Sequence, residues 1–113
     1  MDIQKLQQFL REFAAKRDWE KFHNPKNLSM AMMVEAGELL EIFQWVTNDE
    51  SKLGNLGPEK YQAAKEEMAD IFIYLIRLAD KLDIDLEKAF WEKMDKNGAK
   101  YYLGSEKNKF INK

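Results

Sequence analysis

The chain has 113 residues, of which 45% are hydrophobic and 12% aromatic, and this balance excludes an intrinsically disordered protein. Eighteen basic and twenty acidic residues give a net charge of -2, which leaves no electrostatic footprint for a nucleic acid polymer or an anionic membrane. Only two prolines and five glycines interrupt the sequence, so long helices are favoured. We therefore expect one all-α domain spanning residues 1–113.

Cysteine is absent, so neither a disulfide framework nor a thiolate metal site is available, which suits the cytosol. The amino-terminal segment MDIQKLQQFLREF is charged throughout and lacks the apolar core of a signal peptide. No stretch approaches the roughly 20 apolar residues that are needed to cross a bilayer. We therefore expect a soluble, cytoplasmic protein.

The first predicted helix follows Asp2, which can cap its amino end, and runs to about Arg17. Its apolar residues recur at three- and four-residue steps: Ile3, Leu6, Leu10 and Phe13. The next stretch, DWEKFHNPKN, loses this periodicity and contains Asn24-Pro25, so we interpret it as an ordered loop. The loop carries two aromatic residues and the only histidine of the chain: Trp19, Phe22 and His23.

The second predicted helix runs from about Leu28 to Val46 and is apolar nearly all round. Its apolar residues cover more surface than one neighbouring helix can bury: Met30, Met32, Met33, Val34, Leu39, Leu40, Ile42, Phe43, Trp45 and Val46. We therefore expect part of this surface to contact another copy of the chain.

A polar connection, TNDESKLGNLG, separates the second predicted helix from the third. Gly57-Pro58 opens the third helix, because proline is well suited to the first helical position, and the helix continues to about Leu82. It is the longest helix that we expect.

A fourth helix is predicted after Asp83 or Asp85, either of which can serve as its N-cap. Asn97-Gly98 is a natural stop for this helix. Four helical segments in one small chain predict an antiparallel four-helix bundle that is completed by homo-oligomerisation. A tetramer is favoured over a dimer.

Two pairs of acidic residues fall on the apolar faces of the two longest predicted helices. At 100° per residue, Glu35 and Glu38 lie within the apolar stripe of the second helix, as do Glu67 and Asp70 in the third. Two neighbouring acids lie at the margins of these stripes, where we expect them to face solvent or adjoin the pairs: Glu41 and Glu66.

If the two stripes face each other, four carboxylates meet in a region of low dielectric, where ionised groups without a countercharge are strongly disfavoured. Few basic residues are available there, because Arg77 lies to the side and Lys81 lies more than a turn beyond the acids. A hard divalent cation is therefore expected. Oxygen ligands without histidine or cysteine favour Mg²⁺ or Mn²⁺ over zinc, and the absence of Glu-x-x-His pairs argues against a di-iron site.

A single Glu-x-x-Glu pair is commonplace on solvated helices, and two pairs in apolar stripes are harder to dismiss. The structural alternative is that the helices rotate the acids toward solvent, or that the acids meet Lys and Arg of a partner. The corresponding functional alternative is a non-enzymatic helical module for oligomerisation or partner binding, with a structural cation.

Four segments together resemble a known group: RDWEKFHNPKNL, EAGELLEIFQW, EEMADIFIYLIRLAD and KMDKNGAKY. They are similar to the all-α nucleoside triphosphate pyrophosphatases, which include MazG and the dCTP pyrophosphatases, and the similarity is greatest to the dCTP pyrophosphatase and compact MazG-like branch. The superfamily pattern is Glu-x-x-Glu followed by Glu-x-x-Asp. This chain matches the pattern with four residues: Glu35, Glu38, Glu67 and Asp70.

The resemblance implies Mg²⁺-dependent hydrolysis of a nucleoside triphosphate to its monophosphate and pyrophosphate by a dimer or tetramer. It makes the four pattern residues metal ligands, and Glu38 or Glu35 becomes the candidate for positioning the attacking water. We expect dCTP or a modified dCTP as the substrate, with dATP next, in a nucleotide-pool house-cleaning role.

The resemblance also implies contacts with the substrate from three residues of the loop and long helices. His23 alone would be interpreted as an ordinary hydrogen-bonding residue, and the resemblance makes it a substrate contact. Trp45 and Tyr74 would help to form a pocket for the base, where stacking contributes ~1–3 kcal/mol per base. The alternative interpretation of Trp45 and Tyr74 is that they are ordinary core residues.

A further pattern follows in the fourth helix and beyond it. Lys93, Asn97 and Tyr101 match the K-x-x-x-N-x-x-x-Y pattern of the family and are suited to phosphate charge and hydrogen bonding. Tyr102 stands where the family usually has proline, so the family pattern predicts neither the path of the tail nor a lid role for it.

Overall fold

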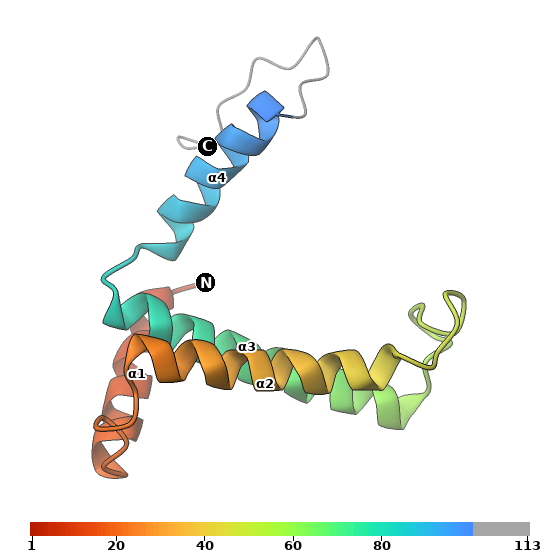
Figure 1. Cartoon of the computed structure of the whole chain (residues 1–113), viewed down its shortest axis with the longest axis horizontal. Helices are drawn as coiled ribbons and strands as arrows, with labels where there is room; N and C mark the ends of the chain where they lie inside the picture. The colour runs from red at the N-terminus through yellow and green to blue at the C-terminus, as the bar shows by residue number, and fades with distance from the viewer. Residues whose placement is uncertain (101–113) are drawn as a thin grey trace. The chain divides into compact units, whose positions relative to one another are not determined.

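A computed structural model describes residues 1–100, which form four α-helices and no strand (Figure 1). The helices are α1 (Ile3–Lys16), α2 (Pro25–Phe43), α3 (Pro58–Lys81) and α4 (Leu86–Lys100). The all-α prediction is confirmed. The chain forms two compact units, one spanning Met1–Leu82 and one beginning at Asp83, and each is described by itself.

Helix α1 begins as the sequence predicts. The Asp2 side chain accepts a hydrogen bond from the backbone N–H of Lys5, at 3.1 Å, and so caps the helix. The helix ends at Lys16, with Arg17 as its C-cap. Ala14 is buried on the inner face.

Helix α2 begins three residues earlier than predicted. The Asn24 side chain accepts a hydrogen bond from the backbone N–H of Asn27, at 2.9 Å, and Pro25 occupies the first turn, where proline is tolerated. The Asn24-Pro25 pair that we assigned to the loop is therefore the start signal of the helix. The helix ends at Phe43 rather than at Val46.

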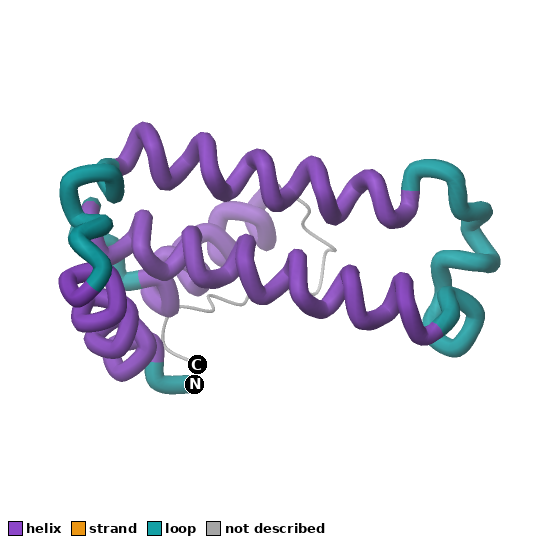
Figure 2. The backbone as a smooth tube through the Cα atoms, turned by 90° about the horizontal axis from the view of Figure 1, so that it is seen from below, coloured by secondary structure: helices purple, strands orange, loops and turns teal. Residues whose placement is uncertain are grey.

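Helices α2 and α3 form an antiparallel pair, and α1 packs against α3 at one end of this pair (Figures 1 and 2). Leu28 of α2 and Ile76 of α3 are each 1% exposed and are the largest fully buried side chains. Burial of a side chain of this size stabilises the fold by ~1.5–3 kcal/mol. This pair of helices is therefore anchored by its own buried side chains and positions the side chains between them.

The connection between α2 and α3, residues 44–57, is held by its own hydrogen bonds. The Thr47 backbone N–H donates to the Glu50 carboxylate at 3.0 Å, and the Glu50 backbone N–H donates to the Thr47 hydroxyl at 3.2 Å. The Asn55 amide donates to the backbone oxygen of Asp49 at 2.9 Å. Gly57 has a φ of 88°, a left-handed conformation that favours glycine, just before α3 begins.

Helix α4, in the second unit, is capped by Asp85, whose carboxylate accepts a hydrogen bond from the Lys88 backbone N–H at 3.1 Å. Asp83 instead adopts a left-handed conformation with a φ of 52°. The predicted stop at Asn97-Gly98 is wrong, because the helix continues to Lys100. Gly98 does not adopt the positive φ that a glycine C-cap requires.

Apolar residues remain exposed on α2 within the single chain: Met30, Met33, Val34 and Leu40. This surface is consistent with the excess of apolar residues in the sequence, and the homo-oligomer stays a prediction. Among the described residues, no helix is both long and apolar enough to cross a membrane.

Candidate functional site

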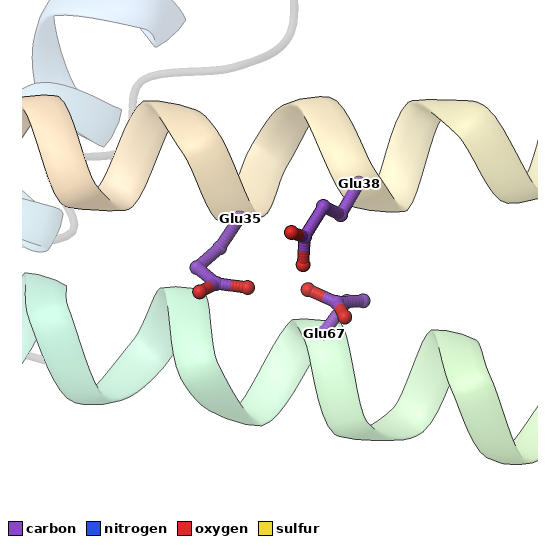
Figure 3. Close-up of side chains that lie close together, drawn as sticks. All are labelled: Glu35, Glu38 and Glu67. Atoms are coloured by element: carbon purple, nitrogen blue, oxygen red, sulfur yellow. The ribbon is translucent and has the colours of Figure 1, made fainter.

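The candidate site lies between α2 and α3, where three carboxylates point toward one another (Figure 3). Glu35 and Glu38 come from α2, one turn apart, and Glu67 comes from α3. One carboxylate oxygen from each residue lies within 4.8 Å of the others. The antiparallel pairing of the two longest helices therefore brings together acids that are about thirty residues apart in the chain.

The three carboxylates lack a positive partner in the part of the chain that the structure describes. Glu35 and Glu67 are half-buried, and each has a buried Oε2 that accepts no hydrogen bond from residues 1–100. None of the ion pairs formed by those residues involves the three acids. Burying a carboxylate oxygen without a partner is unfavourable because the oxygen loses its hydration. A ligand that carries positive charge would compensate for this loss.

The proximity of the acids also changes their proton affinity. The pKa of Glu67 is raised from 4.5 to about 7, first because its protonated form hydrogen-bonds to Glu35, and then because of burial and the nearby Glu38. A proton thus relieves part of the repulsion between these groups. A divalent cation with oxygen-ligand preference would relieve it further, and the donor set of carboxylates without nitrogen or sulfur fits Mg²⁺ or Mn²⁺.

Asp70, the fourth predicted ligand, is half-buried on α3, one turn beyond Glu67, and is not part of the three-carboxylate cluster. Its charge reaches Tyr74, which lies a further turn along the same helix. The pKa of the Tyr74 hydroxyl is raised, first by burial and then by the charges of Glu35 and Asp70. The structure therefore brings Tyr74 within electrostatic reach of two of the acids, and its contact with a base stays a prediction.

The two marginal acids are exposed and are not part of the cluster. Glu41 is exposed on α2. Glu66 is exposed on α3, where it accepts a hydrogen bond from the Gln62 side chain at 3.1 Å. Of the two predicted alternatives, facing solvent or adjoining the pairs, the exposure of both side chains favours the first.

His23 lies at the end of the loop before α2, where a charged cluster that the sequence analysis missed surrounds it. Arg77 of α3 is 2% exposed, and its Nη2 donates to the Glu20 carboxylate at 2.6 Å and lies 3.3 Å from His23 Nδ1. Lys81 forms a second ion pair with Glu20. A single arginine inside the apolar run IFIYLIRLAD was the available signal, because an isolated charge on a buried face requires a partner.

The structure describes three of the four remaining predicted substrate residues, each within its own unit. Trp45 lies just beyond the end of α2 and is 88% exposed. Lys93 is exposed and Asn97 half-buried, one turn apart on α4. Tyr101 lies outside the described residues. Their substrate contacts therefore stay predictions.

Comparison with known proteins places this chain in a family. The model of the MazG-like family matches residues 30–110. Human dCTP pyrophosphatase 1 is 47% identical over 90 residues, which cover 80% of this chain and 53% of the human protein. The rat protein of the same name is 46% identical over the same share of each chain, so this chain spans about half the length of the curated relatives it matches.

A solved structure shows the same fold. A crystal structure of a pyrophosphatase from Archaeoglobus fulgidus has a TM-score of 0.81 and 40% identity, over 88% of this chain and 92% of that chain. The predicted resemblance to the MazG-like and dCTP pyrophosphatase branch is thereby confirmed. The chain belongs to the MazG-like family.

Proposed function

We propose that the protein is a Mg²⁺-dependent nucleoside triphosphate pyrophosphohydrolase, which converts a nucleoside triphosphate to its monophosphate and pyrophosphate. The observation that carries this proposal is the group of three carboxylates between α2 and α3, with buried oxygens on Glu35 and Glu67 that lack partners among the described residues. The names of the relatives, dCTP pyrophosphatase 1 and a pyrophosphatase, support the same reaction class.

In this proposal Glu35, Glu38 and Glu67 would hold the cation. Asp70, one turn away on α3, stays the predicted fourth ligand. Mg²⁺, or Mn²⁺ in its place, supplies charge neutralisation for the polyphosphate and its leaving group. A triphosphate carries several negative charges near neutral pH, so three bare carboxylates would repel it. Nucleotide and cation are therefore expected to bind in a mutually dependent way.

The reaction itself requires that a water oxygen form a bond to the α-phosphorus while the bridging bond to the β-phosphate breaks. The proton of the water passes to a carboxylate, and pyrophosphate leaves. Glu38 is the better candidate for this carboxylate because it is the most exposed of the three acids. Glu35 is half-buried and remains the second candidate.

Recognition of the substrate is assigned to side chains outside the three acids. The pKa of the Tyr74 hydroxyl is raised by burial and then by the charges of Glu35 and Asp70, so Tyr74 lies near the acids. It is proposed to contact the sugar or base of the nucleotide. His23 and Trp45 are proposed to contact the substrate as well. Three further residues are proposed to bind phosphate: Lys93, Asn97 and Tyr101.

The preferred substrate is proposed to be dCTP or a modified dCTP, followed by dATP, and the active form a homo-oligomer in the cytoplasm. The exposed apolar residues of α2 support oligomerisation, since a contact with a second copy would remove them from water. A tetramer is favoured over a dimer. Hydrolysis of surplus or modified triphosphates would fit a role in nucleotide-pool house-cleaning.

The test is a panel of dCTP, 5-methyl-dCTP, dATP and CTP, incubated with the full chain and Mg²⁺ or Mn²⁺. Products are separated by anion exchange, so that pyrophosphate and orthophosphate are distinguished. The proposal predicts monophosphate and pyrophosphate in equal amounts, and no turnover after chelation of the metal.

The alternative function, a non-enzymatic oligomerisation module with a structural cation, predicts a different result in the same panel. No nucleotide would be hydrolysed, although the intact oligomer would still bind the metal in equilibrium dialysis. Metal-linked melting alone does not separate the two, because both functions predict it.

A further inference from the structure

Arg77 is buried in a way that fold stability alone does not explain. Its side chain is 3% exposed and pairs with Glu20, whose own side chain is 42% exposed. Nε and Nη1 of Arg77 are buried without an acceptor among residues 1–100. A buried guanidinium with two unpaired donors is a costly element, and an apolar side chain of similar volume is often as stable in such a place.

The one Arg77 nitrogen that is paired is directed at two acceptors. Nη2 donates to Glu20 Oε1 at 2.6 Å and lies 3.3 Å from His23 Nδ1. A guanidinium nitrogen carries protons only and cannot accept, so the hydrogen bond to His23 requires that Nδ1 be unprotonated. The proton of the neutral ring is then on Nε2.

The rest of the surroundings hold the ring in place without engaging Nε2. The His23 backbone N–H donates to the carbonyl oxygens of Trp19 and Glu20, at 3.1 and 3.2 Å. The ring packs against Trp19 with the ring centroids 5.9 Å apart. Among the described residues the His23 ring forms one hydrogen bond, through Nδ1, so the N–H at Nε2 is left for water or a ligand.

We infer that Arg77 is a positioning residue that holds His23 as the neutral tautomer protonated at Nε2, so that the ring presents a fixed hydrogen-bond donor. Arg77 acts from α3 on a loop residue 54 positions earlier, and the loop and the carboxyl end of α3 lie at the same end of the helix pair (Figure 1). The charge of Arg77 at the same time disfavours a second proton on the ring.

Three charged groups act on His23: Arg77 and Lys81 from α3, and Glu20 from the loop. The pKa of His23 is lowered from 6.5, first by burial, then by Arg77, with Lys81 adding to the effect and Glu20 opposing it. The ring is therefore neutral at and above neutral pH. It offers a directional donor, and not a positive charge, to an acceptor such as a phosphate or base oxygen.

The tautomer is directly measurable because His23 is the only histidine of the chain. In full-length protein labelled with ¹⁵N-histidine, one imidazole gives both nitrogen signals, and a pH titration reports its pKa and its tautomer. We expect Nδ1 to have the shift of an unprotonated nitrogen and Nε2 that of a protonated one, with a pKa below 6.5. A proton on Nδ1 in the wild-type protein would overturn the inference without any variant.

The Arg77→Met variant separates positioning by Arg77 from an intrinsic preference of the ring. The pKa of His23 is expected to rise toward or beyond its ordinary value, and Nδ1 to take the averaged shift of two exchanging tautomers. Nitrogen shifts and a pKa identical to the wild type would also overturn the inference. Should Arg77→Met fail to fold, Arg77→Lys takes its place. The ammonium group can still donate to His23, so Nδ1 is expected to stay unprotonated, and a proton on Nδ1 in the folded Lys variant would overturn the inference.

The matched control is Arg11→Met. Arg11 also connects two helices, because it donates to Asp80 of α3 at 2.6 and 2.8 Å, but it does not contact His23. Its removal is expected to leave both nitrogen signals and the pKa of His23 unchanged. An equal change in this control would assign the effect to general loosening of the α1–α3 contact and overturn the role of Arg77.

The consequence for substrate rests on the proposed function and is tested separately. Arg77→Met is expected to raise KM for the hydrolysed nucleotide about tenfold, the cost of about 1.4 kcal/mol for one misplaced hydrogen bond, with a much smaller change in kcat. An unchanged KM beside the expected nitrogen shifts would overturn the substrate contact alone. Absence of hydrolysis in the wild type would overturn the proposed function, and the nitrogen signals would still decide the tautomer.

Discussion

Glu35 and Glu67 lie on different helices, and each directs toward the other a carboxylate with a buried oxygen that accepts no hydrogen bond from the described residues. Together with Glu38 they place three carboxylate oxygens within 4.8 Å of one another. Like charges at such a distance lower the free energy of unfolding. With a cation bound between them, the same carboxylates raise it. Loss of one of these acids should therefore raise the stability of the metal-free protein and lower the stability of the metal-bound protein.

The Glu67→Gln variant tests this reversal. Without metal it should melt at a higher temperature than the wild type, because a repulsion is removed. The wild type should gain about 2.7 kcal/mol of stability at a Mg²⁺ concentration 100 times its Kd, and the variant should gain little. Thermal unfolding with and without Mg²⁺ measures both effects. The neighbouring exposed acid provides the control, since Glu66→Gln should behave as the wild type; an equal loss of the Mg²⁺ effect there would contradict a local site.

Glu38→Gln should leave the protein folded and nearly inactive. The variant loses a metal ligand and the proposed acceptor of the water proton, and loss of general base catalysis lowers rates roughly 10²–10⁴-fold. Turnover is measured by pyrophosphate release, and folding by circular dichroism. Glu41→Gln on the same helix is the matched control, because Glu41 is exposed and outside the cluster. Retained turnover in Glu38→Gln would remove this residue from the mechanism.

Acid should weaken the contact between the loop before α2 and the end of α3. The pKa of Glu20 is lowered from 4.5 to about 2, first by Lys81 and then by Arg77. A lowered carboxyl pKa means that the stabilisation is present above pH 4.5 and is lost as the pH falls from 4.5 toward 2. In urea unfolding across this range, Glu20→Gln should show a shallower dependence on pH than the wild type. Equal slopes for the two proteins would show that Glu20 does not carry this linkage.

The core between α2 and α3 should be sensitive to truncation. Leu28→Ala should cost about 2–5 kcal/mol of unfolding free energy, because Leu28 is 1% exposed and its loss leaves a cavity. Leu53→Ala, at a position that is 88% exposed, should change stability by less than about 0.5 kcal/mol. Urea unfolding of both variants measures the difference. Similar costs at the two positions would mean that Leu28 does not anchor this core.

The positions of the helices and the acid cluster could be predicted from the sequence because both depend on the periodicity of apolar residues. The 3.6-residue repeat places Glu35 and Glu67 on the inner faces of α2 and α3, and the structure brings them together there. Asp70 lies on the same side of α3 but is not in the cluster, because periodicity gives the direction of a side chain and not how far it lies along the axis from its partners. The distance is set by the register of the two helices, which the sequence pattern leaves open.

The ends of the helices were harder to predict, because the same residue types occur in more than one kind of local structure. Asn24-Pro25 occurs in loops and at helix starts, and the hydrogen bond from Asn27 to Asn24 selects the start. Gly98 was predicted to end α4, but a glycine ends a helix only when it takes a positive φ.

The Arg77, Glu20 and His23 cluster was missed for a related reason. Its members are separated by 57 and 54 positions in the chain, and only the packing of the loop against α3 brings them into contact. The isolated arginine in an apolar run indicated that a partner was needed. It did not identify that partner.

The most direct test of the central claim is hydrolysis of dCTP with Mg²⁺ in water enriched in ¹⁸O, with the products analysed by mass spectrometry. Attack at the α-phosphorus by water held at the carboxylates of α2 and α3 predicts one ¹⁸O atom in the nucleoside monophosphate and none in the pyrophosphate. Label in the pyrophosphate, or release of orthophosphate in its place, would contradict this account of the site.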